Sequence, residues 1–316
     1  MIGRVAALLG LLLAFPLAAQ PDLSRRIGTT VADTGVPGWR FDEFRVPSAD
    51  GERRYRVRLA LPDRPAPPAG FASVYLLDGN AALMETDAAL LGELAGSAQP
   101  PALVFVGYDN DLRIDADARA YDYTPRRPGD AAAQRDALGG RRNGGADAFL
   151  DLLERTLVPK VESIARLDPR RRTLWGHSYG GVFVLHTLFE RHGVFSGYAA
   201  ADPSLWWGEG QLLNEEAAVS TWPQPAPRLW LWVGEGGEKP TASAPPGRDP
   251  ASVEAMRRAR ASVPPDAAAR MAERLARQGL DVRFETLAGQ SHGQTLGTSL
   301  HRLLRSLAAP PASREP

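Results

Sequence analysis

Ser178 lies in the segment Gly176-His177-Ser178-Tyr179-Gly180, which fits the pattern Gly-x-Ser-x-Gly. Residues 172–175 before it are typical of a short buried strand, and residues 182–190 after it are typical of an apolar helix. A strand, a tight glycine turn and a helix together form the turn on which many hydrolases expose a nucleophilic serine. The two glycines are expected because a side chain at either position would collide with the neighbouring strand or helix. The pattern therefore predicts Ser178 as a nucleophile.

A serine hydroxyl is a weak nucleophile at neutral pH and needs a base to take its proton. The chain has 5 histidines. His292 lies in a glycine-bounded loop directly after the last predicted strand, which is where the base follows such a serine. His177 lies inside the turn, where its side chain is expected to point away from the hydroxyl. We therefore predict His292 as the base and interpret His186, His192 and His301 as packed or surface residues.

The acid that would orient the histidine is less sharply defined. It should follow the seventh strand, where Glu235 is the first candidate and Glu238 comes close behind. Asp202, after the sixth strand, is a geometric alternative. A serine–histidine dyad, with the imidazole held by a backbone carbonyl or by water, also stays open.

A reaction at Ser178 would also need backbone N–H groups that stabilise an oxyanion. One is expected from Tyr179, directly after the nucleophile, and the other from Gly79 and Asn80 in the loop after the third strand. Gly79 permits a close approach of the backbone. The alternative is an ordinary Asp-Gly turn.

The elements that must position these residues can be followed along the chain. Alternating residues at 39–46 and 54–61 predict an antiparallel hairpin, and later continuous apolar runs predict strands buried on both faces. We expect one α/β domain of the α/β-hydrolase type, with a mostly parallel eight-stranded sheet flanked by helices. The remaining strands are predicted at 72–77, 102–106, 172–175, 195–200, 228–233 and 281–287, and helices at 146–164, 182–190, 265–278 and 295–307, with a long loop and one short helix at 234–265.

Composition narrows the function further. The 316 residues have a net charge of +0, so no global field favours nucleic acid as a partner. With 0 cysteines, the chain has neither disulfides nor a cysteine metal site nor a lipoprotein anchor. We expect no cofactor, no protein-bound metal and a monomer that acts on a small-molecule ester.

The N-terminus carries a targeting pattern. Arg4 precedes an uncharged apolar run at 5–19 that ends in Leu17-Ala18-Ala19. This run is shorter than the about 20 residues that a transmembrane helix needs. It predicts a cleavable secretory signal at 1–19, and therefore a periplasmic or secreted protein. An uncleaved N-terminal membrane anchor is the alternative. The domain is then expected at 20–309, and a disordered tail at 310–316.

Several separate motifs, which follow one another along the chain in the family's order, resemble the enterochelin-esterase type of α/β-hydrolase. These are bacterial enzymes that cleave trilactone siderophores. The resemblance extends from about Trp39 to His301 and implies Ser178 as nucleophile and His292 as base. It also implies that the amides of Gly79, Asn80 and Tyr179 form the oxyanion hole. In the periplasmic relatives the acid is absent or unusual, and Asp202 stands where relatives usually carry Ser. The motifs are residues 75–81, 106–108, 119–125, 175–181, 203–207 and 291–293.

The same resemblance implies a serine carboxylic-ester hydrolase whose substrate is a ferric or iron-free catecholate trilactone such as enterobactin. Ferric triscatecholates are anionic and aromatic, so Arg119, Tyr121 and Trp206 are expected to bind one by charge and stacking. The alternatives are a surface salt bridge for Arg119 and core packing for Trp206 and Trp207. Rival functions are a general carboxylesterase or feruloyl-type esterase, an acyltransferase, and a siderophore-binding protein without catalysis.

Overall fold

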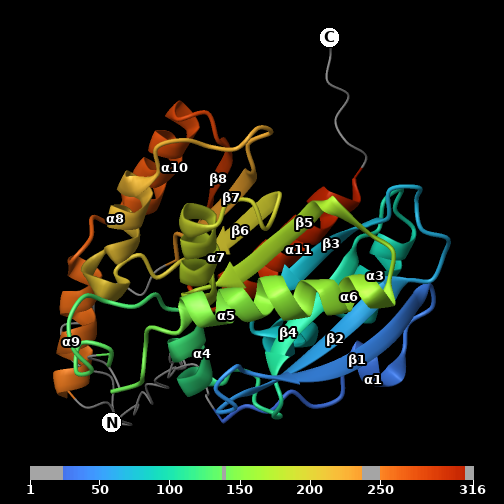
Figure 1. The fold of residues 1–316 in the computed structure, drawn as a ribbon, viewed down its shortest axis with the longest axis horizontal. Coiled ribbons are helices and arrows are strands. Elements are labelled where there is room, and N and C mark those ends of the chain that lie inside the picture. Colours follow the sequence, from blue (N-terminus) through green and yellow to red (C-terminus); the bar gives the residue numbers. More distant parts are fainter. Residues whose placement is uncertain (1–23, 137–139, 237–249, 310–316) are drawn as a thin grey trace, which may run out of the picture.

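The computed structural model describes residues 24–136, 140–236 and 250–309, and a single sheet of eight strands runs through this part of the chain (Figure 1). The first two strands form an antiparallel hairpin, the second pairs antiparallel with the fourth, and all other neighbours are parallel. This confirms the predicted α/β-hydrolase sheet. Across the sheet the strands are β1 (Trp39–Pro47), β2 (Arg54–Pro62), β4 (Ala102–Tyr108), β3 (Phe71–Leu76), β5 (Leu167–His177), β6 (Gly197–Ala201), β7 (Arg228–Gly234) and β8 (Asp281–Leu287).

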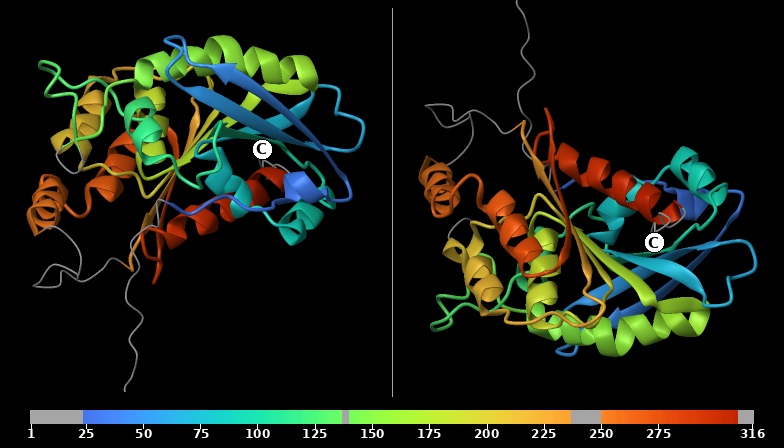
Figure 2. Two further views of the ribbon diagram at one scale, coloured as in Figure 1. Left: turned by 90° about the horizontal axis from the view of Figure 1, so that it is seen from below. Right: turned by 90° about the horizontal axis from the view of Figure 1, so that it is seen from above.

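Helices cover both faces of the sheet (Figure 2). Together with the turns η1 (Leu153–Leu157) and η2 (Trp207–Glu209), the first face carries α5 (Ala146–Leu152), α6 (Val158–Ile164), α7 (Tyr179–Glu190), α8 (Gln211–Ala218) and α10 (Ala267–Arg277). The second face carries α1 (Val31–Thr34), α2 (Gly79–Met84), α3 (Ala88–Ala95) and α11 (Gln294–Ala308). Helix α4 (Ala116–Asp122) packs on α5 and α7, and α9 (Pro250–Ala261) packs on η2. Within the described ranges, no helix combines the length and the apolar character that crossing a membrane requires.

Two apolar cores follow from this layering. Every residue of β3 and β4 is buried, as expected for strands covered by helices on both faces. Phe149 and Phe183 pack at 5.1 Å between ring centroids in the first core, and Leu91 and Leu300 lie in the second. The edge strand β8 instead alternates in burial over most of its length. The buried central strands therefore hold the loops at their carboxyl ends on a rigid base.

Three local differences from the predicted elements have physical causes. Strand β5 begins at Leu167 rather than at 172, because its first residue pairs with Phe71 before the register shifts. The long helix at 146–164 contains a widened π turn, η1, just before Pro159, a residue without an N–H to donate. The helix within 234–265 is α9, which is longer than expected. The predicted segments 1–19 and 310–316 lie outside the described residues.

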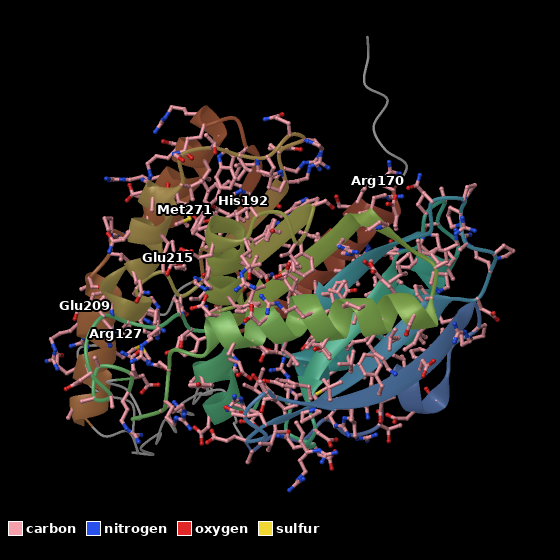
Figure 3. All side chains as sticks on the ribbon, in the orientation of Figure 1. Arg127, Arg170, His192, Glu209, Glu215 and Met271 are labelled. Atoms are coloured by element: carbon pink, nitrogen blue, oxygen red, sulfur yellow. The ribbon has the colours of Figure 1, made fainter. Side chains whose placement is uncertain are left out.

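A buried histidine joins three helices on the first face. His186 of α7 places Nδ1 2.9 Å from Glu215 of α8 and Nε2 3.3 Å from Asp147 of α5. Figure 3 labels Glu215 where α8 faces α7. Burial alone would lower the pKa of this imidazole, but the two carboxylates outweigh it and raise the pKa from 6.5 to about 9. His186 is therefore a cation that holds the helices together.

We expect His186 to make stability depend on pH. Its folded-state pKa lies above the unfolded value, so its stabilisation is fully present below about pH 6.5 and is lost as the pH rises through about 9. A pKa difference of this size corresponds to roughly 3 kcal/mol. Urea unfolding at pH 6 and at pH 9.5 should show a much smaller pH-dependent loss in His186→Gln than in the wild type. His301→Gln is the control, and an unchanged pH dependence in His186→Gln would disprove the assignment.

Candidate active site

Ser178 occupies a strained turn between β5 and α7. Its backbone has φ 60° and ψ −115°, a region that residues with a side chain rarely adopt. The turn is held by two backbone hydrogen bonds, from Ser178 N to Ala201 O at 2.9 Å and from Val182 N to Ser178 O at 3.0 Å. A Cβ on Gly176 would lie 2.4 Å from the carbonyl oxygen of Gly180, so only glycine fits there.

Gly180 does not have the steric role that the sequence predicts. A Cβ at this position would meet its nearest neighbour, Asp78 Oδ2, at 3.6 Å, which is an ordinary contact. The tight position is instead Gly181, where a Cβ would lie 3.0 Å from the Cα of Pro203. The second constraint on the turn therefore comes from the segment after β6.

The nucleophile and the predicted base meet at the carboxyl edge of the sheet. His292 Nε2 lies 3.0 Å from Ser178 Oγ, and His292 Nδ1 lies 3.1 Å from Asp202 Oδ2. The three side chains come from the ends of β5, β8 and β6, which lie at one edge because these strands are parallel. The order hydroxyl, imidazole, carboxylate is the arrangement in which a base takes the serine proton and an acid orients the base.

The acid is placed differently from our first expectation. Asp202, not Glu235, faces the imidazole. Glu235 continues the pairing of β7 with β8, donating its N–H to Leu287 O at 3.1 Å, and its side chain is exposed. The other candidate, Glu238, lies outside the described residues. Asp202 reaches His292 because its φ of 42° turns the chain sharply at the end of β6.

Ser204 is a neighbour of the nucleophile that the sequence analysis missed. Its buried Oγ lies 3.3 Å from Ser178 Oγ, and its N–H donates to Ser178 O at the same distance. The sequence signal that could have pointed to Ser204 is its position in the 203–207 motif, just after the sixth strand. The sequence alone could not show that this segment folds back onto the serine.

The residues expected to form an oxyanion hole lie at helix starts. Tyr179 is the first residue of α7, and Gly79 and Asn80 are the first two of α2, so their N–H groups have no intrahelical acceptor. Gly79 is sterically required, since a Cβ would come within 2.7 Å of the backbone of β4. The Asn80 side chain donates to Asn110 O at 3.0 Å and to Leu112 O at 2.8 Å, which fixes the start of α2.

Arg119 is not the free surface cation that the substrate hypothesis needs. Its guanidinium donates to both carboxylate oxygens of Asp78, at 3.0 and 2.9 Å, and to the carbonyl of His177 at 3.0 Å. The side chains of Arg119 and Asp78 are only 12% and 2% exposed. This buried pair ties the loop after β3 to the end of β5, so the charge of Arg119 is already compensated within the fold.

The predicted aromatic residues differ in their surroundings. Tyr121 packs against Gly145, and its ring lies 4.5 Å from the Arg53 guanidinium. Trp206 is half-buried with its ring centroid 6.2 Å from that of Tyr179, the residue that follows the nucleophile in sequence. Trp207 is buried in the first core, as its packing alternative predicted. Of the three predicted substrate residues, Trp206 is therefore the one whose ring lies near that of Tyr179.

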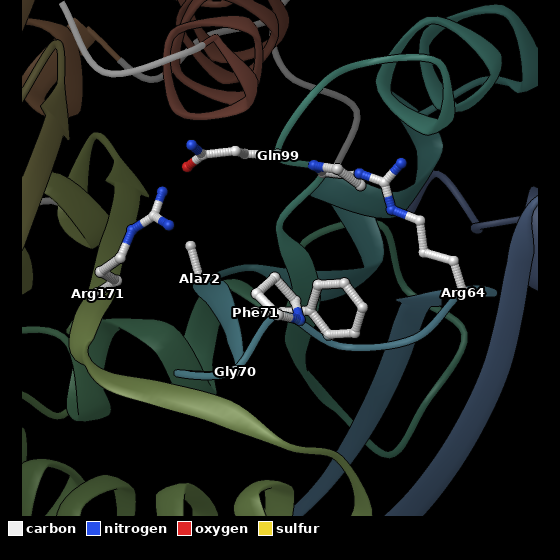
Figure 4. A pocket seen from close by; sticks show the side chains of 8 residues that line it. Arg64, Gly70, Phe71, Ala72, Gln99 and Arg171 are labelled. Carbon is white, nitrogen blue, oxygen red and sulfur yellow. The ribbon is translucent and has the colours of Figure 1, made fainter. Parts of the chain in front are cut away.

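A separate hollow lies at the other edge of the sheet (Figure 4). Phe71, at the amino end of β3, and the side chains of Arg64, Gln99 and Arg171 line it. The carboxyl ends of the parallel strands, and with them Ser178, lie at the opposite edge. This hollow therefore takes no part in the arrangement around the nucleophile.

Comparisons with known proteins agree with the geometry. The sequence model for the putative esterase family matches residues 48–264. The chain belongs to this esterase family. This membership confirms the resemblance to enterochelin-esterase-type hydrolases.

Named relatives are similar to this chain over much of its length. It is 41% identical over 201 residues to the apo-salmochelin esterase of Escherichia coli, covering 64% of this chain and 62% of that protein. It is 33% identical over 195 residues to the ferri-bacillibactin esterase BesA of Bacillus subtilis, covering 60% and 65%. The chain thus matches less than two thirds of the length of these curated relatives. The enterobactin hydrolase IroE, solved with DFP, superposes with a TM-score of 0.69 at 32% identity, covering 89% of this chain and 99% of that one.

The position of the acid can be tested with conservative variants. Asp202→Asn keeps the shape of the side chain but removes the charge that selects the Nδ1–H tautomer of His292, so we expect kcat to fall by about 10³- to 10⁴-fold. Glu235→Gln, which changes an exposed side chain, should stay within about twofold of the wild type. Rates on p-nitrophenyl butyrate would decide this. Wild-type turnover by Asp202→Asn would instead indicate a dyad.

The buried pair at Arg119 generates a further prediction. Arg119→Ala would leave Asp78 buried without a partner, at a cost of about 3–5 kcal/mol in unfolding free energy. Because the loop after β3 would lose its tie to β5, turnover should fall alike on a small neutral ester and on an anionic trilactone. Chemical denaturation and kinetics on both substrates measure this. A loss confined to the anionic substrate would instead support direct binding by Arg119.

Proposed function

We propose that this protein is a serine esterase that hydrolyses the ester bonds of a siderophore trilactone of the catecholate class, such as enterobactin. The observation that carries the proposal is the chain of contacts from Ser178 through His292 to Asp202. Membership of the esterase family and the siderophore-esterase names of its relatives support the substrate class.

The first half of the reaction forms an acyl-enzyme. Ser178 Oγ attacks the ester carbonyl carbon while His292 Nε2 takes the hydroxyl proton. Asp202 accepts a hydrogen bond from His292 Nδ1–H and stabilises the resulting imidazolium. The amides of Tyr179, Gly79 and Asn80 are proposed to donate to the oxyanion of the tetrahedral intermediate. When the intermediate collapses, the ester C–O bond breaks and His292 protonates the departing alkoxide.

The second half releases the acid. A water molecule gives a proton to His292 Nε2 and attacks the acyl carbon, and the second tetrahedral intermediate then expels Ser178, which recovers its proton from the imidazolium. The side chain of His292 is 46% exposed, so water can reach this base. Repetition on the remaining esters would open and then shorten a trilactone.

We also propose that the protein is exported and folds as one domain over residues 20–309. Arg4 and the apolar run at 5–19 support a secretory signal, and hence a periplasmic or secreted enzyme. The absence of cysteine is compatible with such a location, since stability would rest on the two apolar cores.

Ser178→Ala should abolish hydrolysis. In well-studied serine hydrolases, loss of the nucleophile lowers kcat by about six orders of magnitude. Wild-type protein incubated with enterobactin should yield linear trimer, dimer and monomer by liquid chromatography and mass spectrometry, whereas Ser178→Ala should yield none above the uncatalysed rate. The variant should keep the melting temperature of the wild type.

The same measurement separates the rival functions. Wild-type turnover of p-nitrophenyl butyrate without turnover of the trilactone would indicate a general carboxylesterase. Binding of enterobactin, seen as quenching of tryptophan fluorescence, without turnover of either ester would indicate a binding protein. More than a few per cent of wild-type activity in Ser178→Ala would remove Ser178 from the mechanism.

A further inference from the structure

His177, the residue before the nucleophile, contacts the backbone of the base. Its Nε2 lies 2.7 Å from the carbonyl oxygen of His292 and 3.1 Å from Thr295 Oγ1. The rings of His177 and His292 lie 4.7 Å apart between centroids, tilted by 42°. One side chain at the end of β5 thus spans from the turn that carries Ser178 to the loop that carries His292.

The chemistry of these partners fixes the state of His177. A carbonyl oxygen can only accept, so Nε2 must carry a hydrogen and donate it. Burial lowers the pKa of the imidazole well below its usual value, and the neighbouring His292 adds to this effect. His177 is therefore neutral, with its proton on Nε2. It is a poor candidate for a second base, because the proton on Nε2 is committed to the carbonyl of His292.

The base has a partly exposed side chain, so contacts to its backbone carbonyl contribute to fixing its position. The side chain of His292 is 46% exposed and follows two exposed or half-exposed residues, Gln290 and Ser291. Its ring must nevertheless stay 3.0 Å from Ser178 Oγ and 3.1 Å from Asp202 Oδ2. Thr295, fully buried at the start of α11, also donates to the His292 carbonyl at 2.7 Å. The carbonyl of the base is thus anchored from both β5 and α11.

We propose that His177 is a positioning residue: its Nε2–H holds the His292 carbonyl and thereby fixes the distance between the base and the nucleophile. The proposal rests on the proposed esterase function. Because His177 and Ser178 are consecutive, any movement of the turn carries the anchor of the base with it. The covalent chain and this hydrogen bond therefore act with Thr295 and Asp202 to preserve the separation of Oγ and Nε2.

This role predicts which substitutions are tolerated. Gln can place an amide N–H close to the position of the imidazole Nε2–H, so His177→Gln should keep the tie. Asn has one carbon fewer and cannot reach the carbonyl. Phe keeps the ring and its packing but has no donor. If the hydrogen bond is what matters, activity should follow the donor and not the volume of the side chain.

The experiment compares His177→Phe, His177→Asn and His177→Gln on p-nitrophenyl butyrate between pH 6 and 9. A small misplacement of a catalytic group can cost about 10²-fold in rate, so kcat should fall about 10- to 100-fold in the Phe and Asn variants with KM within about twofold. The Gln variant should retain at least about a fifth of the wild-type kcat. Equal losses in Gln and Phe, or wild-type kcat in Phe, would overturn the proposal. If the His177→Phe variant does not fold, the difference in kcat between His177→Asn and His177→Gln decides.

His301→Phe is a matched control. His301 of α11 makes the same kind of bond, from Nε2 to the carbonyl of Glu85 at 2.6 Å, but ties α11 to α2 instead of the base. Its loss should lower the melting temperature and leave kcat unchanged. An equal fall in kcat for His301→Phe and His177→Phe would mean that the effect is general destabilisation, and would reject the proposal.

A second readout does not depend on turnover. With only 5 histidines, the imidazole resonances of protein labelled with ¹⁵N-histidine can be assigned. His177 should show the neutral Nε2–H tautomer from pH 5 to 9. The Nδ1–H proton of His292 should be visible in the wild type and in His177→Gln, but exchange-broadened in His177→Phe. A titrating or Nδ1–H His177 would reject the proposal. If the wild type hydrolyses no ester, the esterase function fails, and this spectrum alone decides the role of His177.

Discussion

The site depends on the close contact between Gly176 and Gly180. Their backbones approach so nearly that a Cβ on Gly176 would lie 2.4 Å from the Gly180 carbonyl oxygen, and this contact forces the unusual φ of 60° at Ser178. The strain is compensated by the surroundings, because β5 is paired on both sides and α7 is almost wholly buried. A serine in a relaxed turn could move away from the base. Here the turn fixes the backbone of Ser178 at the end of β5, and the other groups of the site are arranged around it.

Buried charges and polar groups connect that turn to its neighbours. The Arg119–Asp78 pair links the loop after β3 to the His177 carbonyl, and the next residue of the chain is the nucleophile. On the other side, His177 and Thr295 both contact the carbonyl of His292. The Arg119–Asp78 and His177–His292 contacts join residues that lie 41 and 115 positions apart in sequence. A site built this way is pre-organised, since little reordering is needed when substrate binds.

The parts of the site that could be predicted from sequence are those with a local signature. The turn around Ser178 has its glycines, strand and helix within a few residues, and His292 follows a recognisable last strand. The acid has no such signature: a carboxylate after β6 and one after β7 look alike, and only the turn at Asp202 shows which one reaches the imidazole. Arg119 likewise is visible as a charge, but its partner lies 41 residues away, so its burial could not be anticipated. The fold was more predictable because apolar runs such as those of β3 and β4 report burial directly.

The pairing of Arg119 bears on the proposed binding of an anionic siderophore. A chain of net charge +0 offers no long-range attraction, and the guanidinium closest to the nucleophile turn is already neutralised by Asp78. The ring of Tyr179, the residue after Ser178, lies 6.2 Å from that of Trp206 and 5.5 Å from the Arg119 guanidinium. Stacking on such rings does not depend on the charge of the ligand. Next to Ser178, Arg119 therefore contributes a compensated charge and Tyr179 an aromatic face.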